Sequence, residues 1–167
     1  MNDFIDWHEL ALKVGTIRKN GESVSNRDGW RAFEILLGEQ NLRNAVDYYI
    51  DGFEGSELVR FILWQIHPWS AMEYCYQIYK SDQEIGRRRM AVELLRVVAD
   101  KRVLVWVPKF INDEDSAIQL WGIGIIDYLT MKGLVELEEI ENILNIAETH
   151  PNFAVRERAK IARENLS

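Results

Sequence analysis

Residues 113–129 read DEDSAIQLWGIGIIDYL, an acidic start that runs directly into a segment with apolar side chains on nearly every side. The packing positions at helical spacing are Ile118, Trp121, Gly122, Ile125 and Leu129. A surface helix carries one apolar stripe, whereas a helix that is apolar all round must be covered on several faces. The segment therefore predicts a central helix, about 25 Å long, that packs between neighbouring helices.

The residues before this helix also divide into apolar segments at helical spacing, separated by turn signals. The chain is predicted to begin with a helix capped by Asn2 or Asp3, followed by a polar loop at 15–28. Further helices are predicted at about 30–37, 42–50 and 57–66, and the last of them ends at His67-Pro68. Residues 70–73 (SAME) and 81–84 (SDQE) have the form of capping boxes, in which Ser and Glu each bond one free backbone N–H. Each box predicts the start of a further helix.

The pattern continues to the end of the chain. Residues 101–111 predict a short helix that Pro108 bends or ends, although the run VLVWV at 103–107 is also compatible with a strand. Gly133 suits the end of the central helix, and helices follow at 136–149 and from Asn152 to Leu166. The sequence thus predicts an all-α fold of about nine or ten helices in a single domain over residues 1–167.

Four segments of the chain share a repeated pattern. They are LVRFIL at 58–63, GRRRMAVELL at 86–95, AIQLWGIGII at 117–126 and AVRERAKIAR at 154–163. In each, a long polar side chain stands three residues before a packing position: Arg60 and Leu63, Arg88 and Ala91, Gln119 and Gly122, Arg156 and Ala159. Asp82, Asp113 and Asn152 stand shortly before the last three segments.

This pattern resembles the HEAT repeat, whose second helix commonly opens with Asp or Asn and carries a Val-Arg-x-x-Ala motif. The resemblance covers residues 54–167 and implies a solenoid of stacked helical hairpins, in which neighbouring pairs build one continuous core. Residues 57–167 would form the HEAT-like pairs, and residues 1–56 either a cap or a continuation. The small residue Gly122 would allow close helix contact, so that Gly122→Leu would overpack it.

Composition limits the class of partner. The net charge of −7 disfavours direct binding of nucleic acid, which depends on neutralising phosphates with Lys and Arg, and it equally disfavours an anionic membrane surface. No apolar segment is long enough to span a bilayer and no signal peptide is evident, so we expect a cytoplasmic protein. Cys75, the one cysteine, is expected to be a buried apolar side chain.

Acidic residues are concentrated in one part of the chain. Residues 113–149 carry nine acidic side chains and one basic side chain, Lys132. Unpaired like charges repel one another, and a basic partner would relieve the repulsion. The candidate partner-binding acids are Asp113, Glu114, Asp115, Glu138, Glu139 and Glu141. For the basic run Arg87-Arg88-Arg89 we favour salt bridges to neighbouring acidic helices over an RNA site.

Aromatic side chains are the second candidate set for binding. Trp69 lies at a predicted helix start, and Tyr74 and Tyr76 are expected to reach the surface together with Tyr48. Tyr and Trp are enriched at binding hot spots. No catalytic motif is recognisable, and the three histidines are far apart in sequence, two of them directly before proline. We therefore expect no enzymatic activity, no cofactor and no metal.

Three functions remain open from the sequence. The leading hypothesis is a protein that docks one basic partner on an acidic helical surface. In size, charge and class the chain looks like the small acidic immunity proteins that bacteria pair with toxins, many of them basic nucleases. The second is a HEAT-like adaptor within a larger assembly. The third, a HEAT-like DNA glycosylase, would need a basic concave surface, which the net charge opposes.

Overall fold

The structure is a computed structural model that describes residues 5–18, 20–21 and 29–166. These residues form helices and no strand, which confirms the predicted all-α class. The elements are α1 (Trp7–Val14), α2 (Gly29–Leu37), α3 (Glu39–Ile50), α4 (Ser56–Ile66), α5 (Trp69–Ser81), α6 (Ile85–Val98), the 3-10 helix η1 (Lys101–Val105), α7 (Val107–Ile111), α8 (Ser116–Met131), α9 (Leu137–Glu148) and α10 (Phe153–Glu164).

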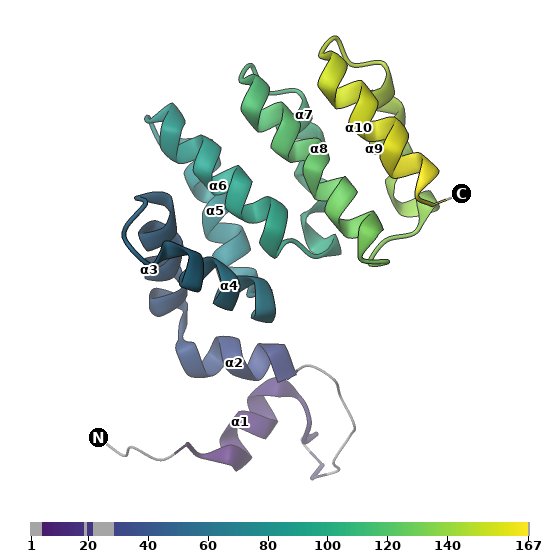
Figure 1. Ribbon diagram of the computed structural model, residues 1–167. Helices are drawn as coiled ribbons and strands as arrows, with labels where there is room; N and C mark the ends of the chain where they lie inside the picture. Colours follow the sequence, from purple (N-terminus) through teal and green to yellow (C-terminus); the bar gives the residue numbers. More distant parts are fainter. Residues whose placement is uncertain (1–4, 19, 22–28, 167) are drawn as a thin grey trace.

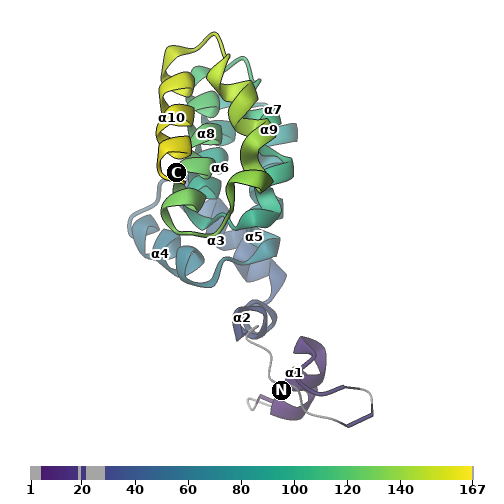
Figure 2. The ribbon, with the colours of Figure 1, turned by 90° about the vertical axis from the view of Figure 1, so that its right-hand side faces the viewer.

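From α3 onward the helices form antiparallel pairs arranged in two layers. In Figure 1, α6, α8 and α10 lie side by side with α5, α7 and α9 behind them, and Figure 2 shows the same layers edge-on. Helix α4 packs against α6 in the first layer, and α3 packs against α5 in the second. This arrangement of helical hairpins is compatible with a helical repeat fold.

Because the helices alternate in direction, the turns lie in two groups at opposite ends of the layers. The turns within hairpins, at 82–84, 112–115 and 149–152, lie at one end of the layers. The connections between hairpins, at 67–68, 99–106 and 132–136, lie at the other end. Helix α8 runs from the first end to the second over 16 residues, a length of about 24 Å. Residues just before and just after α8 are therefore far apart.

Helix α8 is the predicted central helix, and it contacts α6, α7 and α10. Its isoleucines and Leu129 are fully buried. A Cβ atom added to Gly122 would lie 2.5 Å from Phe110 Cβ and 3.2 Å from the backbone nitrogen of Ile111, so the small residue is required there. The helix begins at Ser116 rather than Asp113, because the Asp115 carboxylate caps it by accepting from the backbone N–H groups of Ala117 and Ile118.

Both predicted capping boxes are wrong. Helix α5 begins at Trp69, directly after Pro68, so Ser70 lies inside the helix and cannot cap it. Ser81 ends α5, and the N-cap of α6 is Glu84. A true capping box opens α9, where the side chains of Glu136 and Glu139 each bond the other residue's backbone N–H.

The region at 101–111 contains two short helices and no strand, so the strand alternative is wrong. It divides at Trp106 into η1 and α7 instead of forming one helix. Pro108 lies in the first turn of α7, where its missing N–H would have had no partner in any case. At the N-terminus, Asp6 caps α1, whereas the predicted caps Asn2 and Asp3 lie outside the described residues.

Helices α1 and α2 lie at the end of the layers formed by the later helices (Figure 1). Helix α2 buries none of its residues, although six of its nine side chains are apolar or aromatic. Trp30 and Phe33 are each 54% exposed, and Leu36 and Leu37 are also exposed. An apolar surface of this kind on a helix is a common mark of an interaction site.

The close contact at Gly122 predicts opposite outcomes for two glycines of one helix. Replacing Gly by Ala inside a helix favours folding by about 1 kcal/mol. At Gly122 the new methyl group meets Phe110 Cβ and backbone, and overpacking of this kind costs about 1–3 kcal/mol. We expect Gly122→Ala to lower the free energy of unfolding in urea denaturation, and Gly122→Leu to lower it further.

Gly124→Ala is the matched control for that measurement. Its added methyl group would meet chiefly Cδ of Arg96, the flexible part of a partly exposed side chain that can move aside. We expect this variant to be as stable as the wild type or up to about 1 kcal/mol more stable. Equal stability of Gly122→Ala and Gly124→Ala would contradict the close contact between α7 and α8.

Candidate partner-binding surfaces

The predicted acidic residues do not form one surface. Asp113, Glu114 and Asp115 lie in the turn between α7 and α8, at one end of the layers. The glutamates of α9 begin after α8 has crossed to the other end, about 24 Å away along the helix. The two groups must therefore be considered separately.

At the first group, Asp113 and Asp115 are bound by groups of the protein itself. Asp113 Oδ2 accepts hydrogen bonds from Arg88 and from the hydroxyl of Tyr79, each at 3.0 Å. Asp115 forms a 2.5 Å ion pair with Arg89. The prediction that these two aspartates lack basic partners is wrong, and Glu114 alone of the three is exposed without an ion pair in the described residues.

The basic run Arg87-Arg88-Arg89 supplies these ion pairs, as the sequence predicted. Arg87 binds Asp47 of α3 at 2.8 Å and Asp82 at 3.0 Å, and it also contacts Asp51. Each of the three arginines is thus engaged by carboxylates of the fold. The structure therefore gives this basic run a role in joining successive hairpins.

The other polar residues of the repeated pattern extend the same connection toward the C-terminus. The side-chain amide of Gln119 donates to the backbone oxygen of Asp113 at 2.7 Å. Asn152 in turn donates to the side-chain oxygen of Gln119 at 2.8 Å, and Arg156 donates to the backbone oxygen of His150 at 2.6 Å. We call Arg88, Asp113, Gln119, Asn152 and Arg156 the polar ladder.

At the second group, the start of α9, the carboxylates are much less engaged. Glu138 and Glu141 are exposed and form no ion pair within the described part of the chain. Glu139 lies 3.5 Å from Lys101 of η1. The backbone N–H of Glu136, and secondly Lys101, lower the pKa of Glu139. Four glutamates within six residues thus form one ion pair, between Glu139 and Lys101, although Glu141 lies close enough to Arg163 to help raise the pKa of that arginine.

Two of the three aromatic candidates meet in one stack, and the third lies elsewhere. Trp106 stacks on Trp69 with ring centroids 5.2 Å apart and on Tyr76 at 4.3 Å. Tyr76 is only 8% exposed and its hydroxyl accepts from Lys109, so the prediction that it reaches the surface is wrong. Tyr74 is half-buried and donates to Asp47 of α3, away from the stack.

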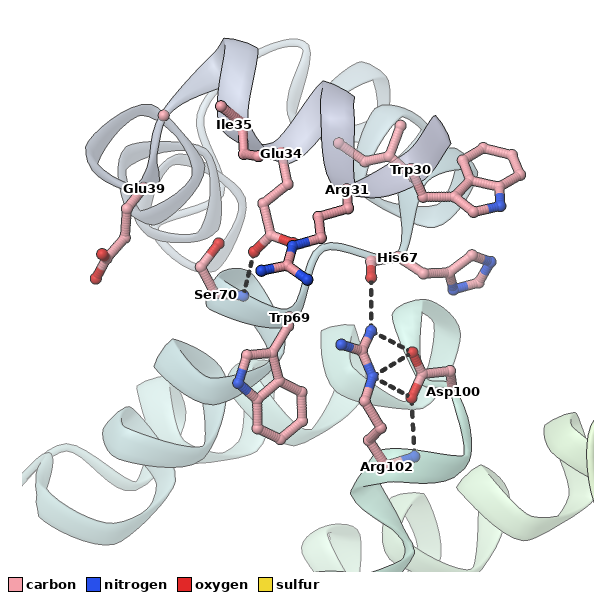
Figure 3. A pocket seen from close by; sticks show the side chains of 12 residues that line it. Trp30, Arg31, Glu34, Ile35, Glu39, His67, Trp69, Ser70, Asp100 and Arg102 are labelled. Atoms are coloured by element: carbon pink, nitrogen blue, oxygen red, sulfur yellow. Dashed lines mark hydrogen bonds and ion pairs between the residues drawn. The ribbon is translucent and has the colours of Figure 1, made fainter. Parts of the chain in front are cut away.

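A hollow of about 800 Å³, which no sequence pattern indicated, opens between α2 and the connections next to it. Figure 3 shows α2 above this hollow, with the α4–α5 turn and η1 below. Its lining residues are Trp30, Arg31, Glu34, Ile35, Gly38, Glu39, Ile66, His67, Trp69, Ser70, Asp100 and Arg102. Of these, only Trp69 was predicted to take part in binding, since the others come from separate segments without a shared motif.

Hydrogen bonds fix the walls of the hollow. Glu34 Oε1 accepts from the backbone N–H of Ser70 at 2.8 Å, which ties α2 to the first turn of α5. Arg102 pairs with Asp100 through two of its nitrogens and lies 5.0 Å over the ring of Trp69. His67 is the one non-glycine residue with positive φ among those described. Its Nδ1 donates a hydrogen bond of 2.9 Å to the backbone oxygen of Val98.

Other titratable residues occupy structural positions. Cys75 is fully buried, as predicted, and burial raises the pKa of its thiol. His150 is buried at the turn before α10 and accepts from the backbone N–H of Asn152. No three His, Cys, Asp or Glu side chains in the described residues lie close enough together to hold a metal ion. The described helices also include none that could cross a membrane.

No protein-family model matches the chain, and comparisons with curated proteins and with solved structures find no match either.

The ion pair between Arg89 and Asp115 predicts a dependence of stability on pH. The hydrogen bond from Arg89 is the main cause that lowers the pKa of Asp115 in the folded protein. Because the pKa of Asp115 is lower in the folded protein, its ionised carboxylate stabilises the fold at pH values above the unfolded-state pKa of about 3.9. This stabilisation is lost as the pH falls through the folded-state pKa. Asp115→Asn, which keeps a good N-cap, should lower the melting temperature by a few degrees at pH 7.

The difference in melting temperature should shrink as the pH falls to about 3, because protonation removes the same charge from the wild type. Glu114→Gln is the neighbouring control, since Glu114 forms no ion pair among the described residues. It should melt with the wild type at both pH values. A constant difference for Asp115→Asn across this range would rule out the charge as its cause.

Proposed function

We propose that this chain is a non-enzymatic protein-binding module that docks a basic protein partner. The observation that carries the proposal is the start of α9, where Glu138 and Glu141 are exposed without an ion pair in the described residues. Like charges held together on one helix turn repel one another, and a partner that brings Lys or Arg would remove this repulsion. The proposed contact consists of Glu138, Glu139 and Glu141.

The aspartates at the opposite end contribute less to this proposal than the sequence indicated. Asp113 and Asp115 already bind Arg88 and Arg89, so a partner would have to displace those pairs to reach them. Glu114 remains available as an exposed carboxylate. Trp69 lines the hollow together with Asp100 and Arg102, the residues on either side of Lys101, which contacts Glu139.

Within this class, the best specific proposal is an immunity protein that neutralises a cognate basic toxin, such as a nuclease, in the cytoplasm. Exposed carboxylates would steer a cationic toxin and raise its association rate. Occupying a positive groove would then keep nucleic acid out of the toxin. The net charge of −7 and the exposed glutamates of α9 support this proposal.

We further propose that the hairpins belong to the HEAT-like class. The polar ladder supports this, because Arg88 and Gln119, at equivalent repeat positions, are each bonded to a turn residue of the next hairpin, Asp113 and Asn152 respectively. Buried small residues at the equivalent positions Ala91, Gly122 and Ala159 support it as well. In such an arrangement each helix pair covers the apolar face of its neighbour.

The binding proposal is tested by reversing charge at two sites of equal net change. The test variant is Glu138→Lys with Glu141→Lys, which leaves the capping residue Glu139 in place. The control is Glu54→Lys with Glu84→Lys, two exposed glutamates outside α9 that form no ion pair among the described residues. Tagged wild type and both variants are used to capture partners from the native cell lysate at low and moderate salt.

We expect one small basic protein to bind the wild type and the control, and to be lost or weakened at least tenfold in the α9 variant. Growth arrest by that partner alone, relieved by this chain, would support the immunity proposal. Recovery of a large assembly that survives the α9 substitutions would instead indicate an adaptor subunit. Equal loss in both variants would show that net charge, not the α9 surface, determines binding.

A further inference from the structure

The polar groups that line the hollow beneath α2 are unequally satisfied. Its acceptors are engaged: Glu34 binds the backbone N–H of Ser70, Asp100 binds Arg102, and Glu39 binds Arg43 at 2.5 Å. The charge of Glu34 also lies at the N-terminus of the 13-residue helix α5, where the helix dipole stabilises an anion. The carboxylates of the hollow are thus already compensated by the protein.

The groups that remain without partners are hydrogen-bond donors. Arg31 forms no hydrogen bond or ion pair with the described residues, and the NH1 group of Arg102 is similarly unused. The hydroxyl of Ser70 is buried and has no partner. Figure 3 shows the guanidinium of Arg31 reaching down from α2 and that of Arg102 rising from η1 into the same space.

From this imbalance we infer that the hollow binds an oxyanion, a carboxylate or a phosphate group, between Arg31 and Arg102. Guanidinium groups match the paired oxygens of both anions, and charge-assisted hydrogen bonds are the stronger kind. Trp69, under Arg102, offers an apolar wall to the rest of the ligand. This inference does not depend on the proposed protein partner.

Each donor is held differently. Arg102 is fixed by Asp100 and by the backbone oxygen of His67, so its free NH1 edge has a set direction. Arg31 is carried by α2, which the Glu34–Ser70 hydrogen bond ties to α5. The ligand would therefore bridge α2 and η1, two elements separated by more than 60 residues in the chain.

Binding is measured by calorimetry at low ionic strength and pH 7, with inorganic phosphate and with glutarate as separate probes. Fluorescence provides a second readout, because Trp30 and Trp69 line the hollow. Arg31→Gln removes the free charge without breaking a bond in the described residues, and it should raise the Kd at least tenfold.

Arg158→Gln on α10 is the control, with the same change of charge far from the hollow in the chain. Saturable binding of either probe that weakens in Arg31→Gln and not in Arg158→Gln would support the site, and the tighter probe would identify the ligand class. Equal weakening in both variants would indicate general attraction to positive charge and overturn the inference. So would the absence of saturation with both probes up to tens of millimolar.

Discussion

The contact of Gly122 with α7 is the constraint on which the packing of the later hairpins depends. Without a side chain at this position, α8 can approach Phe110 and Ile111 closely while α6 and α10 cover its other faces. This burial on several sides is why the helix needs apolar residues all round. The contact between Gly122 and α7 also positions the turn at 112–115, because α7 is only five residues long and leads directly into that turn.

That turn shows how the fold uses charge. Arg88 and Arg89 of α6 bind Asp113 and Asp115 of the next hairpin, and Gln119 and Asn152 continue the connection to the last one. A carboxylate that already binds a guanidinium offers less to a partner than a free one. Carboxylates therefore stabilise the stack at one end of α8, as Asp113 and Asp115, and are exposed at the other end, as Glu138 and Glu141.

The sequence predicted what depends on local pattern: the all-α class, the buried central helix, the close contact at Gly122 and the role of Arg87–Arg89. It predicted less well what depends on which segments meet. The partners Arg89 and Asp115 stand 26 residues apart, so counting charges within residues 113–149 could not reveal the pair. At α5, the helix begins directly after Pro68, and Glu34 of α2 accepts from the backbone N–H of Ser70, which the predicted capping box assigned to the side chain of Glu73. The hollow escaped prediction for the same reason, since its lining comes from separate segments.

Helix α2 connects these features, because it is amphipathic in sequence yet buries no residue. Little buried apolar area holds it in place, so its position depends strongly on the Glu34–Ser70 hydrogen bond and on contacts with α1 and α3. Elements with few buried contacts open at low free-energy cost. A ligand that contacts both Arg31 and Arg102 would bind more tightly when α2 is docked than when it is open. This difference in affinity would stabilise the docked position of α2. It would thereby also fix the exposed Trp30 and Phe33, which links the hollow to the apolar face of α2.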